Sequence, residues 1–211
     1  MNNQTQGKRP HIDAILNFLS EIGIEYCIEE SVKGSFAENI EIRNGVIHLD
    51  YSKVEVVDLL HESGHMALVL KECRHLFSGN LNKGFMQYIS KINEMTEGGL
   101  FGTDTKLDIL MCCEDSEVTA WAWAVGVKLE LPHHEIITDD SYDGHGSFIR
   151  DHLALSHKNS MPYVGVAKLH HATYTKRYSR MLEKHMPESQ FYPHMNYWTA
   201  DAALSANNCK I

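Results

Sequence analysis

The sequence predicts an α+β fold with a small, mostly antiparallel sheet and a larger number of helices. Apolar residues recur at helical spacing in several segments, which predicts amphipathic helices. Residues 40–49 alternate apolar and polar side chains around Asn44-Gly45, a pattern typical of a β-hairpin with a two-residue turn. The chain then enters a predicted helix that contains His61-Glu62-Ser63-Gly64-His65. This order places a sheet directly before two potential metal ligands.

The other predicted elements follow from the same patterns. Residues 11–22 carry their apolar side chains on one side and end at Gly23, which predicts an N-terminal helix. Residues 24–28 fit a short strand. The glycine-rich segment 74–103, with a predicted helix at 85–92, is either a lid over the site or a plain connection.

Three regions are expected along the chain. Residues 1–9 are polar and predict a disordered tail, and residues 10–132 predict a core domain. Residues 133–211 predict a mostly helical C-terminal extension packed on that core, with helices at 147–155 and 163–181.

Composition restricts the classes of protein that this chain can represent. With 211 residues and 43% hydrophobic residues, it is long enough to bury a core. A net charge of −9 argues against a nucleic-acid-binding surface. We find no signal-peptide core and no run long enough to span a membrane, so we expect a cytoplasmic protein, unless it is exported by a route that needs no cleaved signal. Five cysteines without a CxxC pair are expected to be reduced.

The segment around His61 has the features of a helix that carries a metal site. Ser52-Lys53-Val54-Glu55 has the form of a capping box, which predicts a helix start just before the histidines. The histidines lie along the edge of the helix's apolar stripe. Gly64 has no side chain, so a neighbouring element can approach closely there.

His61 and His65 are four residues apart, so both imidazoles lie on one helix face and can converge on one ion. Zinc accepts neutral imidazole nitrogen in tetrahedral geometry. Glu62 is offset around the helix, where it can act as general base toward a water molecule. The H-E-x-x-H pattern therefore predicts a catalytic Zn²⁺ site.

A third protein ligand is expected, and it is sought in the next helical pattern, residues 104–127. Glu114 and Glu117 fall on one otherwise apolar stripe of that predicted helix. A carboxylate on such a face needs a partner, and a metal ion is a suitable one. The spacing alone leaves both residues open.

From residue 40 to residue 132 the chain resembles the ImmA/IrrE-like zinc metallopeptidases, a gluzincin-type family. The resemblance rests on the hairpin before the H-E-x-x-H helix and on the sequence from Glu117 through Trp121 and Trp123 to Pro132. It implies a zincin-like fold, with Glu117 as the third zinc ligand. Glu114 then becomes a residue that orients a ligating histidine or an alternative ligand. It also implies that the sheet's edge strand pairs with a peptide substrate.

These observations predict a zinc-dependent metallopeptidase that acts on a peptide or protein, with no nucleic acid or membrane partner. Two alternatives stay open: a non-catalytic metal-binding interaction protein on the same scaffold, and a hydrolase of a non-peptide amide. Glu62 favours catalysis, because a purely structural site does not need this carboxylate.

Further side chains are weaker candidates for the site. Adjacent histidines on a helix cannot both face one ion, which argues against the pairs 133–134 and 170–171 as ligand sets. The spacing of acidic residues in 139–144 does not fit a calcium loop. One hydrogen-bonding group is expected to enter the cleft, and the sequence does not choose among His145, His152, Tyr88 and Tyr142.

Overall fold

The computed structural model describes residues 9–34, 37–96, 105–156, 158, 161–176, 187, 189 and 191–209. Most of the predicted tail, residues 1–8, lies outside these residues. Arg9, the last residue of the predicted tail, is within the described part. Its Nη1 donates a hydrogen bond to the carbonyl of Tyr51 at 2.8 Å.

The sheet has three strands, β1 (Tyr26–Ile28), β2 (Ile40–Arg43) and β3 (Val46–Leu49), in the order β1-β3-β2. The predicted hairpin of β2 and β3 is confirmed, and Asn44 and Gly45 both have positive φ, as a tight hairpin turn requires. The sheet is mixed, so the expectation of a mostly antiparallel sheet is wrong. β3 lies between its neighbours, antiparallel to β2 and parallel to β1.

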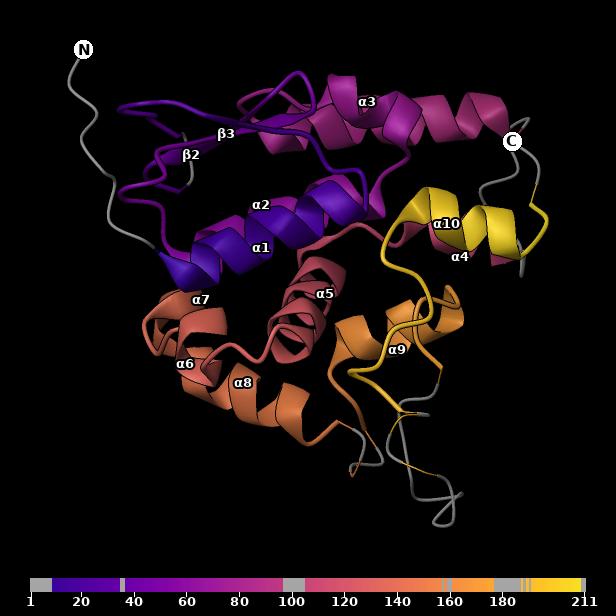
Figure 1. The fold of residues 1–211 in the computed structure, drawn as a ribbon. Helices are drawn as coiled ribbons and strands as arrows, with labels where there is room; N and C mark the ends of the chain where they lie inside the picture. Colours follow the sequence, from indigo (N-terminus) through magenta and orange to yellow (C-terminus); the bar gives the residue numbers. More distant parts are fainter. Residues whose placement is uncertain are drawn as a thin grey trace.

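Helices make up most of the described chain, and Figure 1 shows α1 and α2 between the sheet and helices α5 to α9. The helices are α1 (Pro10–Glu21), α2 (Val56–Leu68), α3 (Leu81–Met95), α4 (Thr105–Met111), α5 (Asp115–Lys128), α6 (His133–Ile136), α7 (Ser141–Gly144), α8 (Gly146–Ala154), α9 (Val164–His171) and α10 (Ala200–Ala206), with a 3₁₀-helix, η1, at Lys71–Leu76. None of the described helices is both long and apolar enough to cross a membrane.

The predicted N-terminal helix and the helix within residues 74–103 are present as α1 and α3. The predicted helix at 147–155 corresponds to α8. The one at 163–181 is shorter, because α9 ends at His171 and residues 177–181 lie outside the described part.

The helix that carries the histidines begins later than the sequence predicts. Glu55 is its N-cap residue, without a side-chain cap, and α2 starts at Val56. Ser52 instead belongs to a turn held by Asp50, whose Oδ1 accepts from both the backbone N–H and the hydroxyl of Ser52. The predicted capping box is therefore wrong, because Ser52 lies in this turn and Glu55, not Ser52, is the N-cap residue of α2.

The expected single helix over residues 104–127 is two helices with a break at residues 112–114. Glu117 accepts a hydrogen bond from the backbone N–H of Glu114 at 2.7 Å, and the Glu114 carbonyl accepts from the N–H groups of Glu117 and Val118. These bonds start α5 as a new helix. Side chains on either side of the break consequently do not form one stripe.

The core joins α2 to α5. A Cβ atom on Gly64 would lie 2.8 Å from Cγ1 of Val118, which confirms that this glycine allows a close approach. Trp121 and Trp123 are buried in the core, as expected. Residues after 132 complete this packing: Trp121 donates its indole N–H to the carbonyl of Trp198, and α9 packs along α5.

Candidate metal centre

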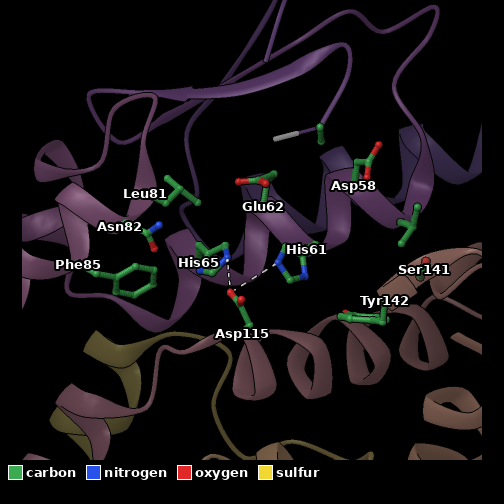
Figure 2. A pocket seen from close by; sticks show the side chains of 12 residues that line it. Asp58, His61, Glu62, His65, Leu81, Asn82, Phe85, Asp115, Ser141 and Tyr142 are labelled. Atoms are coloured by element: carbon green, nitrogen blue, oxygen red, sulfur yellow. Dashed lines mark ion pairs between the residues drawn. The ribbon is translucent and has the colours of Figure 1, made fainter. Parts of the chain in front are cut away.

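Two helices bring three potential metal ligands together. Oδ1 of Asp115, on α5, lies 3.4 Å from Nε2 of His65 and 4.0 Å from Nε2 of His61, both on α2. The three ligand atoms all lie within 4.8 Å of one another. Figure 2 shows the Asp115 carboxylate pointing from the start of α5 toward the two imidazoles.

This convergence follows from local structure. The spacing of four residues places His61 and His65 on the same face of α2, and their rings are 4.9 Å apart. The missing side chain of Gly64 lets α5 approach α2. The break before α5 then places Asp115 at the first position of the new helix, facing the histidines.

Glu117 lies elsewhere, so its assignment as the third ligand is corrected. Its side chain is 0% exposed and its carboxylate is held by Lys168 at 2.7 Å, by the hydroxyl of Ser116 and by the backbone N–H of Glu114. These contacts give the buried charge a counter-ion and two donors, which answers the need for a partner without a metal. Asp115 supplies the carboxylate at the histidines instead.

Glu114 does not orient a ligating histidine either. It is the N-cap residue of α5, and its exposed carboxylate pairs with Lys168 at 2.7 Å. Glu114 and Glu117 would share a stripe with the apolar residues before them only if residues 104–127 formed one continuous helix. The break at residues 112–114 separates α4 from α5, so that shared stripe does not form.

Glu62 has the surroundings expected of a general base. The residue is 8% exposed, and its side chain lines the same cleft as the histidines. Within the described residues its carboxylate has no hydrogen-bond or ion-pair partner. Burial, with smaller contributions from the charges of Asp58 and Asp115, raises the pKa of Glu62 to about 7. A carboxylate with such a pKa can both accept and return a proton near neutral pH.

The imidazoles are suited to bind a metal. Burial and the neighbouring His61 lower the pKa of His65 to about 3, while the Cys113 backbone acts in the opposite direction. Burial also lowers the pKa of His61, and Asp115 partly opposes this. Both rings are therefore neutral at pH 7, the form that ligates zinc. With one carboxylate, this donor set fits Zn²⁺.

The centre lies in a cleft of about 440 Å³. Its walls come from α2, α3, α5, α7 and the connection before β2. The lining residues are Ala37, Val57, Asp58, His61, Glu62, His65, Leu81, Asn82, Phe85, Asp115, Ser141 and Tyr142. The helix α3 within the predicted glycine-rich insert thus forms one wall.

Of the four candidates for a hydrogen-bonding group, only Tyr142 lines this cleft. It has a positive φ of 56°, which is unusual for a residue with a bulky side chain. Its hydroxyl lies 2.6 Å from Oγ1 of Thr119, on α5. Tyr88 is buried in the core, and His145 and His152 are not among the lining residues.

The adjacent histidine pairs are also absent from this centre. Among the described residues, neither 133–134 nor 170–171 belongs to a group that could hold a metal ion. A second such group exists on the sheet, formed by Cys27, Glu29 and His48. There the Glu29 carboxylate already pairs with His48 at 2.7 Å and with Arg43 at 2.8 Å.

The sequence analysis missed Asp115 and Asp58 as residues of the site. A signal for Asp115 was present: Glu114-Asp115-Ser116-Glu117 has polar and acidic residues directly before an apolar run, a pattern that marks a helix start. An acidic residue at the first position of a new helix would then have been a third-ligand candidate. Asp58 lies one turn before Glu62 on α2 and could have been found by that spacing.

The outer edge of β2 is only partly available for a substrate strand. The carbonyl of Ile42 accepts from the backbone N–H of Gly79 at 2.9 Å. A small cavity beside Glu62 does reach this edge at Ile40. Pairing of a peptide with β2 consequently stays a prediction.

We compared the chain with known proteins. No protein-family model matches it, and neither the curated proteins nor the solved structures include a significant match.

Proposed function

We propose that the protein is a zinc-dependent peptidase, with a zincin-like site related to that of the ImmA/IrrE-like metallopeptidases. The observation that carries the proposal is the convergence of His61, His65 and Asp115 beside Glu62 in one cleft. Asp115 departs from the family pattern, in which a glutamate on the later helix is the third ligand. Both are carboxylate ligands, and zinc accepts either.

His61, His65 and Asp115 would hold the ion. When bound, zinc supplies Lewis acidity, which polarises a carbonyl oxygen and makes water more acidic. The cleft gives Glu62 a position next to the reacting centre, where its carboxylate takes a proton from the attacking water. The same carboxyl group then returns this proton to the leaving amine.

Two features favour a catalytic role over a purely structural metal site. Among the described residues, the group around His61 and His65 contains three potential ligands and no fourth, and a structural zinc site has four protein ligands. Glu62 is mostly buried, has no partner among the described residues and lines the cleft, so its carboxylate is available to a water molecule or a substrate there.

The experiment combines metal analysis with a peptide-cleavage screen. Native protein, His61→Ala and Glu62→Gln are purified in parallel, zinc is measured by mass spectrometry, and each is incubated with a diverse peptide pool. We expect one zinc per native chain, stoichiometric zinc in Glu62→Gln without cleavage, and loss of zinc in His61→Ala. Full zinc retention in His61→Ala, or unchanged cleavage by Glu62→Gln, would overturn the proposal. Stoichiometric zinc without cleavage of any peptide would favour the non-catalytic alternative.

A further inference from the structure

The cleft has two chemically different ends, with the histidines between them. Figure 2 shows Leu81, Asn82 and Phe85 on one side of the histidines. Asp58 and Tyr142, with Ser141, lie on the other side (Figure 2). The first end is mostly apolar, and the ring of Phe85 lies 5.5 Å from that of His65. The second end combines a carboxylate with an aromatic ring.

The charge in this cleft is unbalanced. Three of the twelve lining residues are acidic, and none of the twelve is a lysine or an arginine. Asp115 faces the histidines, and Glu62 is assigned to proton transfer. The carboxylate of Asp58 remains, and in the described part of the chain it has no hydrogen-bond or ion-pair partner. One negative charge in the cleft is thus left for a ligand to neutralise.

Two further observations at this end favour a cationic ligand. Glu62, nine-tenths buried and without a partner among the described residues, faces the same cleft and lies one helical turn from Asp58. The aromatic ring of Tyr142 forms part of the wall, and its hydroxyl contact with Thr119 holds it there. An aromatic ring and carboxylates in the wall of one cleft are a common setting for an ammonium or guanidinium group.

We propose that the end of the cleft formed by Asp58 and Tyr142 binds a cationic group of the substrate, next to the bond that is cleaved. This proposal rests on the proposed peptidase function and names its substrate class: a peptide with a positive charge on one side of the scissile bond. The opposite end, at Leu81 and Phe85, takes an apolar side chain. The cation is either a lysine or arginine side chain or the free amino terminus of the peptide.

Binding of small peptide hydroxamates separates these sources without requiring cleavage. The hydroxamate binds the zinc, and three probes are compared: an N-acetylated norleucine probe, the same probe with lysine, and the norleucine probe with a free amino terminus. Their affinities are measured by calorimetry for zinc-loaded native protein and for Asp58→Asn. Asp151→Asn, an exposed aspartate on α8 outside the cleft, is the matched control.

We expect at least one cationic probe to bind native protein and Asp151→Asn about tenfold more tightly than the acetylated norleucine probe. In Asp58→Asn this preference should disappear while the norleucine probe binds as before. A lysine-specific gain identifies a side-chain site, and an amine-specific gain identifies an amino-terminal site. Equal affinity of all three probes for native protein, or a preference that survives in Asp58→Asn, would overturn the proposal. An Asp58-dependent preference in a protein that cleaves no peptide would overturn the peptidase function alone.

Discussion

Oδ1 of Asp115 lies 3.4 Å from Nε2 of His65, although the two residues belong to different helices. The aspartate side chain is short, so this approach requires the start of α5 to lie directly against the face of α2 that carries the histidines. Gly64 on α2 and the helix break before Asp115 together provide that geometry. The candidate metal centre therefore depends on how α5 begins as much as on the H-E-x-x-H sequence.

The first prediction separates the two carboxylates of the first turn of α5. Asp115→Asn should weaken zinc binding by more than about 100-fold, because it removes a direct ligand. It should leave the thermal stability of the metal-free protein nearly unchanged, since this side chain is 79% exposed. Glu117→Gln should lower the thermal stability of the metal-free protein and should reduce zinc affinity less than Asp115→Asn does. Competitive zinc titration and thermal denaturation of the metal-free proteins measure both effects. If Glu117→Gln empties the site and Asp115→Asn does not, the assignment of Asp115 is wrong.

The second prediction concerns the ion pair that anchors α5 to α9. Lys168→Met would leave the buried Glu117 carboxylate without its counter-ion, although two hydrogen-bond donors remain. We expect a loss of roughly 1–3 kcal/mol in the free energy of unfolding. The double variant Lys168→Met/Glu117→Gln should recover part of this loss, because no buried charge is then left unpaired and the remaining carboxylate, Glu114, is exposed to water. Urea denaturation of both single variants and of the double variant completes the cycle, and strictly additive losses would exclude the coupling.

Some of this molecule could be predicted from local sequence alone. The hairpin followed from Asn44-Gly45 between alternating residues, and α1 followed from its apolar spacing, because both signals are complete within a short window. The position of His61, Glu62 and His65 on one helix followed in the same way. In each case the physical cause is local backbone geometry.

The third ligand and the strand arrangement depended on interactions that spacing does not encode. In the sequence, the helical spacing of apolar residues continues from residue 104 to residue 127. In the structure, the hydrogen bonds between Glu114 and Glu117 end that continuity and start a new helix. Nothing in the sequence indicated that Lys168 neutralises Glu117, since they meet only when α9 packs on α5. Likewise, the sequence does not indicate that β3 lies in the middle of the sheet. β1 pairs with β3 in parallel because of that order.

The third prediction tests the close packing at Gly64. A methyl group there would lie 2.8 Å from Cγ1 of Val118 and 3.3 Å from the indole of Trp121, so α2 and α5 must move apart. Gly64→Ala should therefore cost about 1–3 kcal/mol through overpacking, despite alanine's better helix propensity. Because the same movement separates His65 from Asp115, zinc affinity should also fall. Ser63→Ala, a buried neighbour that adds no atoms, is the control and should leave zinc affinity unchanged. Native zinc affinity in Gly64→Ala would show that the spacing between these helices does not determine the site.

The fourth prediction follows from the pKa of Glu62, which burial raises from 4.5 to about 7. Between these values the folded metal-free protein binds more protons at Glu62 than the unfolded chain does. The contribution of this group to stability is therefore greatest below pH 4.5 and decreases as the pH rises to 7. The side-chain amide of the Glu62→Gln variant does not titrate, so the variant lacks this loss. The stability of the variant relative to native protein should thus increase from pH 5 to pH 7 by about 2 kcal/mol.

Urea denaturation in the presence of a chelator measures this difference at each pH, with the titrations of His61 and His65 common to both proteins. Glu21→Gln, at the exposed end of α1, is the matched control and should track native protein across this range. A constant difference between Glu62→Gln and native protein from pH 5 to pH 7 would show that Glu62 is not held in a burial-dominated environment. It would also remove the electrostatic basis for its role as a base near neutral pH. A difference that grows as the pH rises would support the burial-dominated environment of Glu62 and its role as a base. This measurement requires neither a bound metal nor a known substrate.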